Sequence, residues 1–231
     1  MRVRERRTRP GGGVVNALPL IAAGLSYPDD DLMADRAAVA REARGLPDGP
    51  GREALVAFMD WWAREPAGAL RRRYVETFDL SRRTSLDMTY FTHGDRRQRG
   101  LALVALRRRY EDAGFGLDGP ELPDHLPVML EFAALDPQAG AALLADHRPT
   151  IELLRLALER AESPWAALLG ALCARLPGLD DDGRAEVRRL AREGPPGESV
   201  GLEPFAPPEV MPPAAPPASP ACAGGGGGGA R

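Results

Sequence analysis

Apolar residues recur along much of this chain at every third or fourth position, the spacing that places them on one face of an α-helix. Residues 52–64 are a clear case, with Leu55, Phe58, Met59 and Trp62 on a common face. No segment shows a convincing alternation of apolar and polar residues, which is the pattern of a half-buried strand. The chain is therefore predicted to be all-α, with a single-domain helical bundle as its architecture.

Residues with capping chemistry predict where individual helices begin and end. Asp29 opens a segment that ends at Gly45, and Asp136 precedes a proline, which is favoured in the first turn of a helix. Asp180 opens a last, more polar helix, and Asp95 precedes a further apolar run that it is predicted to cap. These signals divide the chain into a succession of helices joined by short loops.

The composition changes at both ends of the chain. Ten of the 23 prolines follow Gly194, and an unbroken glycine run comes after them. Such a segment cannot bury enough apolar surface to offset the entropy lost on ordering it. The chain is therefore divided into a disordered arginine-rich leader (1–13), an all-α domain (14–193) and a disordered Pro/Gly-rich tail (194–231).

The arginine-rich start superficially resembles an export signal. Asn16 and Pro19 interrupt the apolar part that follows, and no clear small-residue cleavage site is present. A basic leader before a first core helix is the favoured interpretation. No run approaches the roughly 18 apolar residues that a membrane span needs, so we expect no direct membrane insertion.

Charge and residue usage exclude several classes of function. The net charge of −3 gives no electrostatic reason to expect nucleic acid as a partner. All 30 basic residues are arginine, and without lysine the chain cannot be a pyridoxal enzyme, a Walker-type NTPase or a protein kinase. Cys173 and Cys222 are too few for a four-ligand zinc site and suggest no disulfide framework, which favours the reducing cytoplasm.

Two histidines lie beside aspartates and allow an alternative function. His93, Asp95, Asp124 and His125 could serve a small metal-dependent enzyme as ligands. Neither pair has the i, i+3 or i, i+4 spacing of a helical metal site. The favoured interpretation is structural, with the aspartates capping helices and the histidines hydrogen-bonded nearby. We expect no resident cofactor and no metal.

A helical bundle can leave a groove that accepts an amphipathic helix of a partner. Acidic residues gather near the two loops that contain these histidines, and they favour a peptide that carries basic residues. These acids are Asp87, Asp95, Glu121, Asp124 and Glu131.

Three stretches of the chain together resemble the NarJ family of nitrate reductase assembly chaperones. They are Tyr74–Asp79, Tyr90–Leu103 and Glu121–Ala133, in the family's order. The last two each begin as a short loop that leads into a helix with an apolar stripe. Pro123-Asp124-His125 is also similar to the hallmark loop of the wider TorD/DmsD group. The similarity extends from about residue 27 to residue 176.

The resemblance implies an all-helical, cytoplasmic, system-specific chaperone that is not an enzyme and not part of the finished reductase. Its client would be the apo form of the catalytic (alpha) subunit of respiratory nitrate reductase, bound through the N-terminal segment. The chaperone would keep that subunit competent for molybdenum cofactor insertion and delay its docking to the membrane. Proteins of molybdenum cofactor biosynthesis are further expected partners. A nucleotide-regulated relative is disfavoured, because the chain has neither lysine nor a phosphate loop.

The resemblance also implies roles for individual residues. Those expected to bind the client peptide are Tyr90, Asp95, Arg97, Asp124, His125 and Glu131. Those expected to shape the two loops are Gly94, Gly100, Pro123 and Pro127. At the two glycines we expect a tight backbone geometry in which a side chain would collide.

Overall fold

The computed structural model describes residues 2–5, 16–94 and 97–194. The contacts between residues divide the chain into two compact units, Met1–Glu198 and Ser199–Arg231. All residues that the structure describes belong to the first unit. The helices and strands of this unit are β1 (Arg2–Glu5), α1 (Ala17–Leu25), α2 (Asp30–Arg44), α3 (Arg52–Arg64), α4 (Ala67–Tyr74), the π-helical turn η1 (Val75–Asp79), the 3₁₀ turn η2 (Arg82–Thr84), α5 (Tyr90–His93), α6 (Arg97–Asp112), β2 (Phe115–Asp118), α7 (Leu126–Leu135), α8 (Pro137–Asp146), α9 (Arg148–Arg160), α10 (Trp165–Cys173) and α11 (Asp181–Glu193).

Side-chain caps start three of the helices where the sequence predicts them. The carboxylate of Asp29 accepts a hydrogen bond from the third residue of α2 at 2.8 Å. Asp136 caps α8 in the same way at 3.0 Å, and Asp180 caps α11 at 2.7 Å. Each cap satisfies an amide that has no partner within its own helix. The predicted all-α bundle is confirmed.

Trp165 of α10 organises the core of the bundle. Its indole nitrogen donates a hydrogen bond to the carbonyl of Gly24 at 2.8 Å, which fixes α1 against α10. Its ring meets those of Tyr74 and Phe78 nearly edge-on, at centroid distances of 6.0 and 5.2 Å. Edge-to-face contacts add to the energy of burying each ring. The core thus holds the ends of α1 and α4 in place.

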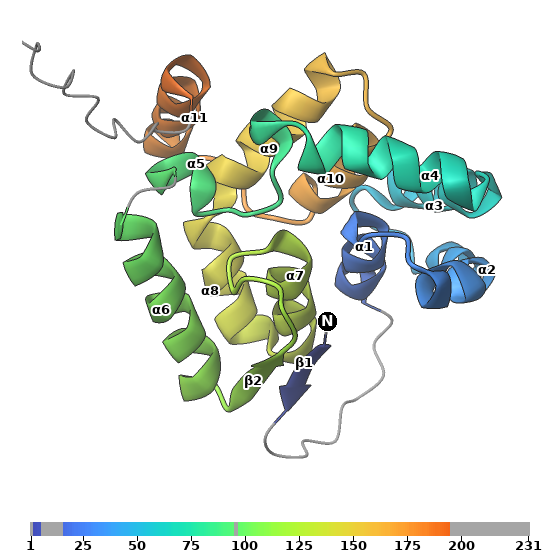
Figure 1. The fold of residues 1–231 in the computed structure, drawn as a ribbon, viewed down its shortest axis with the longest axis horizontal. Coiled ribbons are helices and arrows are strands. Elements are labelled where there is room, and N and C mark those ends of the chain that lie inside the picture. Colours follow the sequence, from blue (N-terminus) through green and yellow to red (C-terminus); the bar gives the residue numbers. More distant parts are fainter. Residues whose placement is uncertain (1, 6–15, 95–96, 195–231) are drawn as a thin grey trace, which may run out of the picture. The chain divides into compact units, whose positions relative to one another are not determined.

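Helices α7 and α8 lie side by side, and α1 packs against α7 (Figure 1). A Cβ atom on Gly140 of α8 would lie only 2.2 Å from the Cα atom of Ala133 of α7. Only glycine permits this close approach of the two backbones. Because α7 is also buried against α1, its N-terminal end has a fixed position, and the candidate site is built there.

The structure contains one small sheet that the hydrophobic pattern does not predict. Strand β1 pairs antiparallel with β2, with Arg2 opposite Asp118 and Glu5 opposite Phe115. Residues 2–5 therefore form a strand, although the sequence analysis assigns them to a disordered leader. The hydrophobic pattern does not reveal this strand, because the backbone hydrogen bonds that join it to a strand edge depend little on the side chains. The rest of the predicted leader, and the predicted tail from 195 onward, lie outside the described residues.

Helix α6 departs from the predicted apolar stripe. Leu101 and Val104 are 69% and 50% exposed, whereas Leu106 and Tyr110 form the buried side of the helix. The face that α6 buries is set by the segments that pack on it, and periodicity alone does not specify that face. Within the described ranges, no helix is both long and apolar enough to traverse a bilayer.

Candidate functional site

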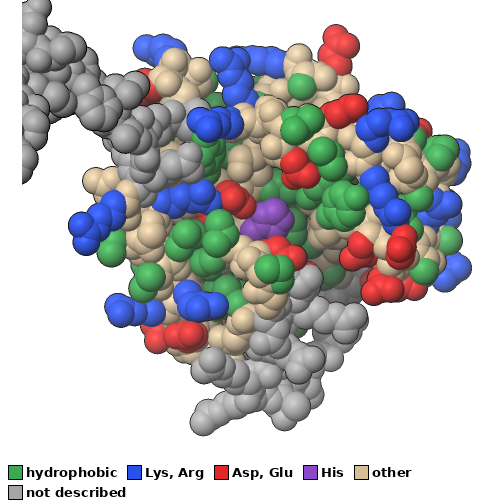
Figure 2. Space-filling model, in the orientation of Figure 1, with side chains coloured by type: hydrophobic (Ala, Val, Ile, Leu, Met, Phe, Trp, Pro, Cys, Tyr) green, Lys and Arg blue, Asp and Glu red, His purple; other side chains and the backbone are tan. Residues whose placement is uncertain are grey.

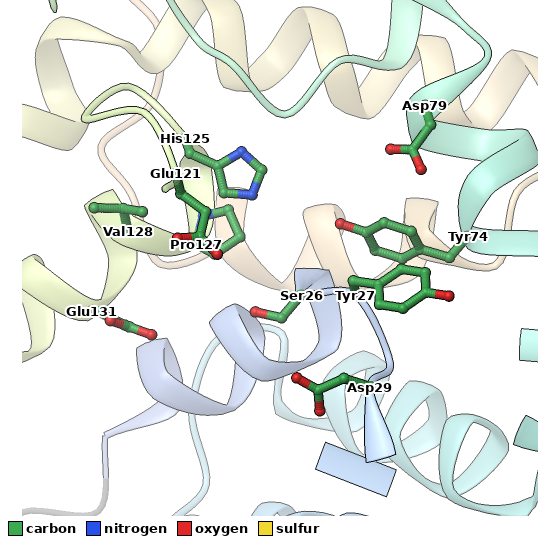
Figure 3. Close-up of a pocket in the computed structure, with 10 residues that line it drawn as sticks. All are labelled: Ser26, Tyr27, Asp29, Tyr74, Asp79, Glu121, His125, Pro127, Val128 and Glu131. Atoms are coloured by element: carbon green, nitrogen blue, oxygen red, sulfur yellow. The ribbon is translucent and has the colours of Figure 1, made fainter. Parts of the chain in front are cut away.

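An open cavity of about 340 Å³ lies between the start of α7, the end of α4 and the connection from α1 to α2. Figure 3 shows the residues that line it, which are Ser26, Tyr27, Asp29, Tyr74, Asp79, Glu121, His125, Pro127, Val128 and Glu131. On the molecular surface, a histidine lies near the centre of the face shown in Figure 2, with acidic and apolar side chains around it. Three segments that are distant in sequence therefore form one cavity.

Tyr74 lies across the cavity from His125 (Figure 3). Its hydroxyl donates a hydrogen bond to the carbonyl of Leu25 at 2.9 Å, and its ring meets that of Tyr27 edge-on at 5.5 Å. Burial raises the pKa of Tyr74 well above its ordinary value, so the phenol stays neutral at physiological pH. This wall of the cavity is therefore aromatic, and Tyr27 is 46% exposed.

The segment before α5 and the segment before α7 are joined by backbone hydrogen bonds. The amide of Met88 donates to the carbonyl of Asp124 at 3.0 Å, and the amide of Leu126 donates to the carbonyl of Leu86 at 2.8 Å. The residues between these bonds face each other as an isolated antiparallel bridge. The bridge brings together the two loops that the sequence singles out.

A charged cluster, Asp87–His125–Arg99, lies on this bridge. The Nδ1 atom of His125 is 3.0 Å from Asp87 Oδ1, and Arg99 donates to Asp87 Oδ2 at 2.8 Å. Burial alone would raise the pKa of Asp87, but hydrogen bonds from His125 and Arg99 lower it below its ordinary value. The ionised carboxylate can only accept, so the imidazole carries a hydrogen on Nδ1 and donates it to Asp87.

Asp124 has no exposed surface. Its Oδ2 accepts hydrogen bonds from the Thr89 amide at 3.0 Å and from the Thr89 hydroxyl at 2.5 Å, with Arg99 at 3.6 Å. Burial raises the pKa of Asp124, an effect that the Thr89 bonds oppose. The prediction that Asp124 caps a helix is wrong, because α7 has no side-chain cap bond and the carboxylate binds a residue 35 positions away. In this structure Asp124 therefore holds the two loops together, and its binding of the client peptide stays a prediction.

The cavity lining is acidic. It contains four carboxylates, and no arginine is among the described residues that line it. Asp29 is engaged as the cap of α2, whereas Asp79 makes no side-chain hydrogen bond or ion pair within the described parts of the chain. Carboxylates gathered around a concave surface produce a negative potential there. The cavity therefore suits a cationic group with an apolar or aromatic body.

The structure separates the residues that the sequence predicts to bind a peptide. His125 and Glu131 line the acidic cavity. Tyr90 instead lines a neighbouring cavity of about 220 Å³, where the Arg99 guanidinium lies 5.6 Å from its ring centre. Arg97 is exposed at the start of α6 and lines neither cavity. Of the predicted set, only Tyr90, His125 and Glu131 thus line these two adjacent cavities, which share Asp79.

The predicted loop-shaping residues have different roles. Gly94 has φ of 58° and ψ of −144°, a conformation that side chains disfavour. At Gly100 the prediction of a collision is wrong, because this residue is inside α6 and a Cβ atom would meet nothing within 4 Å. The Pro123 carbonyl accepts a hydrogen bond from the Tyr110 hydroxyl at 2.7 Å, and Pro127 lies in the first turn of α7.

Several lining residues are not singled out as site residues by sequence reasoning. Tyr74 is named only as the first residue of a stretch that resembles the NarJ family, and Asp29 is recognised only as a helix cap. Tyr27 and Asp79 carry no local signal for a site, although Asp79 ends one of the three stretches that resemble the NarJ family. Their place in the cavity follows from the packing of α1 and α4.

The structure describes three of the four residues of the metal alternative, which are His93, Asp124 and His125. Among the residues that the structure describes, no group of three or more His, Cys, Asp or Glu side chains could hold a metal ion. Asp124 and His125 are instead bonded to Thr89 and Asp87. Asp95, with its predicted capping and binding roles, lies outside the described residues.

Known proteins resemble this chain in sequence and in fold. A family model described as nitrate reductase delta subunit matches residues 46–170. The probable nitrate reductase molybdenum cofactor assembly chaperone NarJ of Bacillus subtilis is 35% identical over 156 residues, which are 67% of this chain and 85% of the relative. The nitrate reductase molybdenum cofactor assembly chaperone NarJ of Escherichia coli K12 is 34% identical over 186 residues, 78% of each chain. A crystal structure of an Archaeoglobus fulgidus protein named for redox enzyme maturation has the same fold, with a TM-score of 0.53, 22% identity, and coverage of 80% of this chain and 98% of the other.

Proposed function

The chain belongs to the nitrate reductase delta subunit family, and from that premise we propose that it is an assembly chaperone for a nitrate reductase and not an enzyme. Two relatives that match most of its length are named as molybdenum cofactor assembly chaperones of nitrate reductase. The client is the catalytic subunit before cofactor insertion, in the cytoplasm. Holding that subunit delays its docking to the membrane.

The client's N-terminal segment binds at the acidic cavity. The observation that supports this most directly is the lining, which combines four carboxylates with the rings of Tyr27 and Tyr74 and has no arginine among its described residues. Such a surface attracts a cationic side chain electrostatically and offers an aromatic face to it. An N-terminal segment that carries basic residues has the complementary charge.

The size of the cavity limits how the peptide binds. One turn of an α-helix with its side chains is 5.4 Å long and 10–12 Å wide, which corresponds to roughly 420–610 Å³. The cavity, at about 340 Å³, is smaller than one turn. The peptide therefore lies across the opening and inserts one or two side chains. Such a limited contact, together with the entropy lost on ordering the peptide, favours reversible binding.

Calorimetry with a synthetic peptide of the nitrate reductase N-terminus tests this mode of binding. Asp79→Asn removes a charge from the cavity at an exposed side chain without a hydrogen bond or ion pair among the described residues. We expect it to weaken binding about threefold to tenfold, because one close charge pair at a partly exposed site contributes about 0.6–1.4 kcal/mol. Asp112→Asn, the matched control, makes the same chemical change at an exposed position on α6.

Equal affinities for the wild type and both variants would show that the peptide does not bind at this cavity. No heat at high micromolar peptide, with the protein folded, would contradict the chaperone mechanism itself. A loss of affinity in both variants alike would indicate a non-specific effect of net charge.

A further inference from the structure

A separate cavity, of about 320 Å³, lies between α5, α6 and the junction of α8 with α9 (Figure 1). Helix α6 contributes an apolar wall to it, formed by Ala102, Ala105 and Leu106. The cavity shares no lining residue with the acidic one. Its volume is at the lower end of the range of small-molecule sites, which begins at about 300 Å³.

Helix α9 begins at this cavity, because its N-cap residue His147 and its third residue Thr150 both line it. Within the described part of the chain, no side chain caps this helix start. The amide of Ile151 donates to the His147 carbonyl at 3.0 Å, which is the first bond of the helix. The amides of Arg148 and Thr150 therefore have no partner inside α9. Free amides at the start of a helix attract an anion.

The side chain of Thr150 is an observation independent of the helix start. Thr150 is only 5% exposed, and it lines the cavity. Its hydroxyl makes no hydrogen bond to any residue that the structure describes. A hydroxyl withdrawn from bulk water without a partner costs free energy. An acceptor group bound in the cavity removes that cost.

Two imidazoles add further hydrogen-bonding groups to the lining. The Nδ1 atom of His147 donates to the Leu143 carbonyl at 3.0 Å, which leaves Nε2 for another partner. The His93 side chain makes no hydrogen bond or ion pair within the described ranges. The two charged side chains of the lining, Arg109 and Asp146, pair with each other at 2.6 Å, so together they carry no net charge. The start of α9 therefore gives the cavity a weakly positive character.

We propose that this cavity binds a small organic monocarboxylate. The Thr150 hydroxyl and the free amides of α9 donate to the carboxylate, and the apolar body of the ligand lies against Ala102, Ala105 and Leu106. A helix start carries roughly half a positive charge, which suits one negative charge better than the nearly two of a phosphate ester. This inference does not depend on the proposed function, whose cavity is acidic.

Fluorine NMR titration of the full chain with para-fluorobenzoate tests the proposal. The uncharged para-fluorobenzamide is its match in shape. We expect the benzoate to bind in the millimolar range and about tenfold more tightly than the amide, a factor that corresponds to 1.4 kcal/mol. Equal affinities for the two would overturn the proposal. Tighter binding of para-fluorophenyl phosphate than of the benzoate would overturn the assignment of a monocarboxylate.

Substitution of Thr150 locates the bound carboxylate. Thr150→Val removes the hydroxyl with little change in volume and should weaken benzoate binding about tenfold. Its Tm should stay within about 2 °C of the wild type, because the hydroxyl has no partner to lose. Thr77→Val makes the same change at a half-buried residue outside the cavity, and this matched control should leave the affinity unchanged.

His93→Leu is a second variant, at a partly exposed side chain, and should weaken benzoate binding about threefold. Wild-type affinity in both Thr150→Val and His93→Leu would place the benzoate elsewhere and contradict the proposal. A Thr150→Val protein that melts several degrees lower but binds benzoate like the wild type would show that the hydroxyl is structural, which also contradicts it.

Discussion

Replacing Asp124 with alanine distinguishes a positioning role from direct contact with a peptide. The change leaves the amide and the hydroxyl of Thr89 without their acceptor, and Thr89 is only 5% exposed, so water has little access. Hydrogen bonds to a charged group contribute about 1.5–3 kcal/mol each. Burying the ionised carboxylate costs free energy, and this cost raises the pKa of Asp124. The alanine variant no longer has this cost, which offsets part of the loss of stability. We expect a net loss of about 2–4 kcal/mol.

Thermal unfolding measures this loss. For a domain of this size, 1 kcal/mol lowers the Tm by about 2–4 °C, so the expected decrease is about 4–16 °C. Two milder variants serve as controls. Asp124→Asn keeps an oxygen acceptor for the Thr89 amide, and Thr89→Val removes only the hydroxyl, so each should lose less stability than Asp124→Ala.

Peptide binding to the folded variants completes the test. Because the Asp124 side chain has no exposed surface, Asp124→Asn should bind the client peptide within about threefold of the wild type. An Asp124→Ala protein that unfolds at the wild-type temperature but no longer binds the peptide would refute the reasoning. In that case the carboxylate would contact the peptide, and its burial between the loops would not describe the binding-competent state.

Two further predictions concern glycines and pH. Gly100→Ala should stabilise the protein by about 0.5–1 kcal/mol, because alanine has the higher helix propensity and the space around this exposed helical position is open. Gly140→Ala should instead destabilise the protein by about 3 kcal/mol or more, because the added Cβ atom would collide with the backbone of Ala133. Urea denaturation checks both, and equal effects would contradict the packing of α7 on α8. Burial raises the folded-state pKa of Asp124 above its unfolded value near 3.9, so its contribution to stability is present below that value and is lost as the pH rises through the folded pKa. The urea midpoint of the wild type relative to that of Asp124→Asn should therefore fall as the pH rises above about 4, and a pH-independent difference would contradict this assignment.

The predictable part of the fold consists of its local features. Residues 52–64 form α3 with the predicted bounds, and Leu55 and Trp62 are fully buried in it. Asp29 and Asp136 cap helices as predicted, because a cap depends on an oxygen and an amide two or three residues apart. Interactions between residues so close along the chain can be predicted from the sequence itself.

The candidate site was predictable only in part. The two loops and His125 with Glu131 follow from the family resemblance, and the structure places both residues in the acidic cavity. The roles of Tyr74 and Asp79 in that cavity, and the placement of Tyr90 in its neighbour, do not follow from any local pattern. They depend on how α4 and α1 pack against the core.

The sequence by itself determined that this protein is a bundle of helices, where many of those helices begin, and that it lacks the lysine chemistry of several enzyme classes. Only the tertiary structure decided that Asp124 is bonded to Thr89 and buried, that Leu101 is exposed, and that residues 2–5 pair with β2. The physical reason is the distance along the chain over which each interaction acts. Periodicity and capping act over a few residues of one helix, whereas burial and hydrogen bonding between loops depend on which distant segments meet.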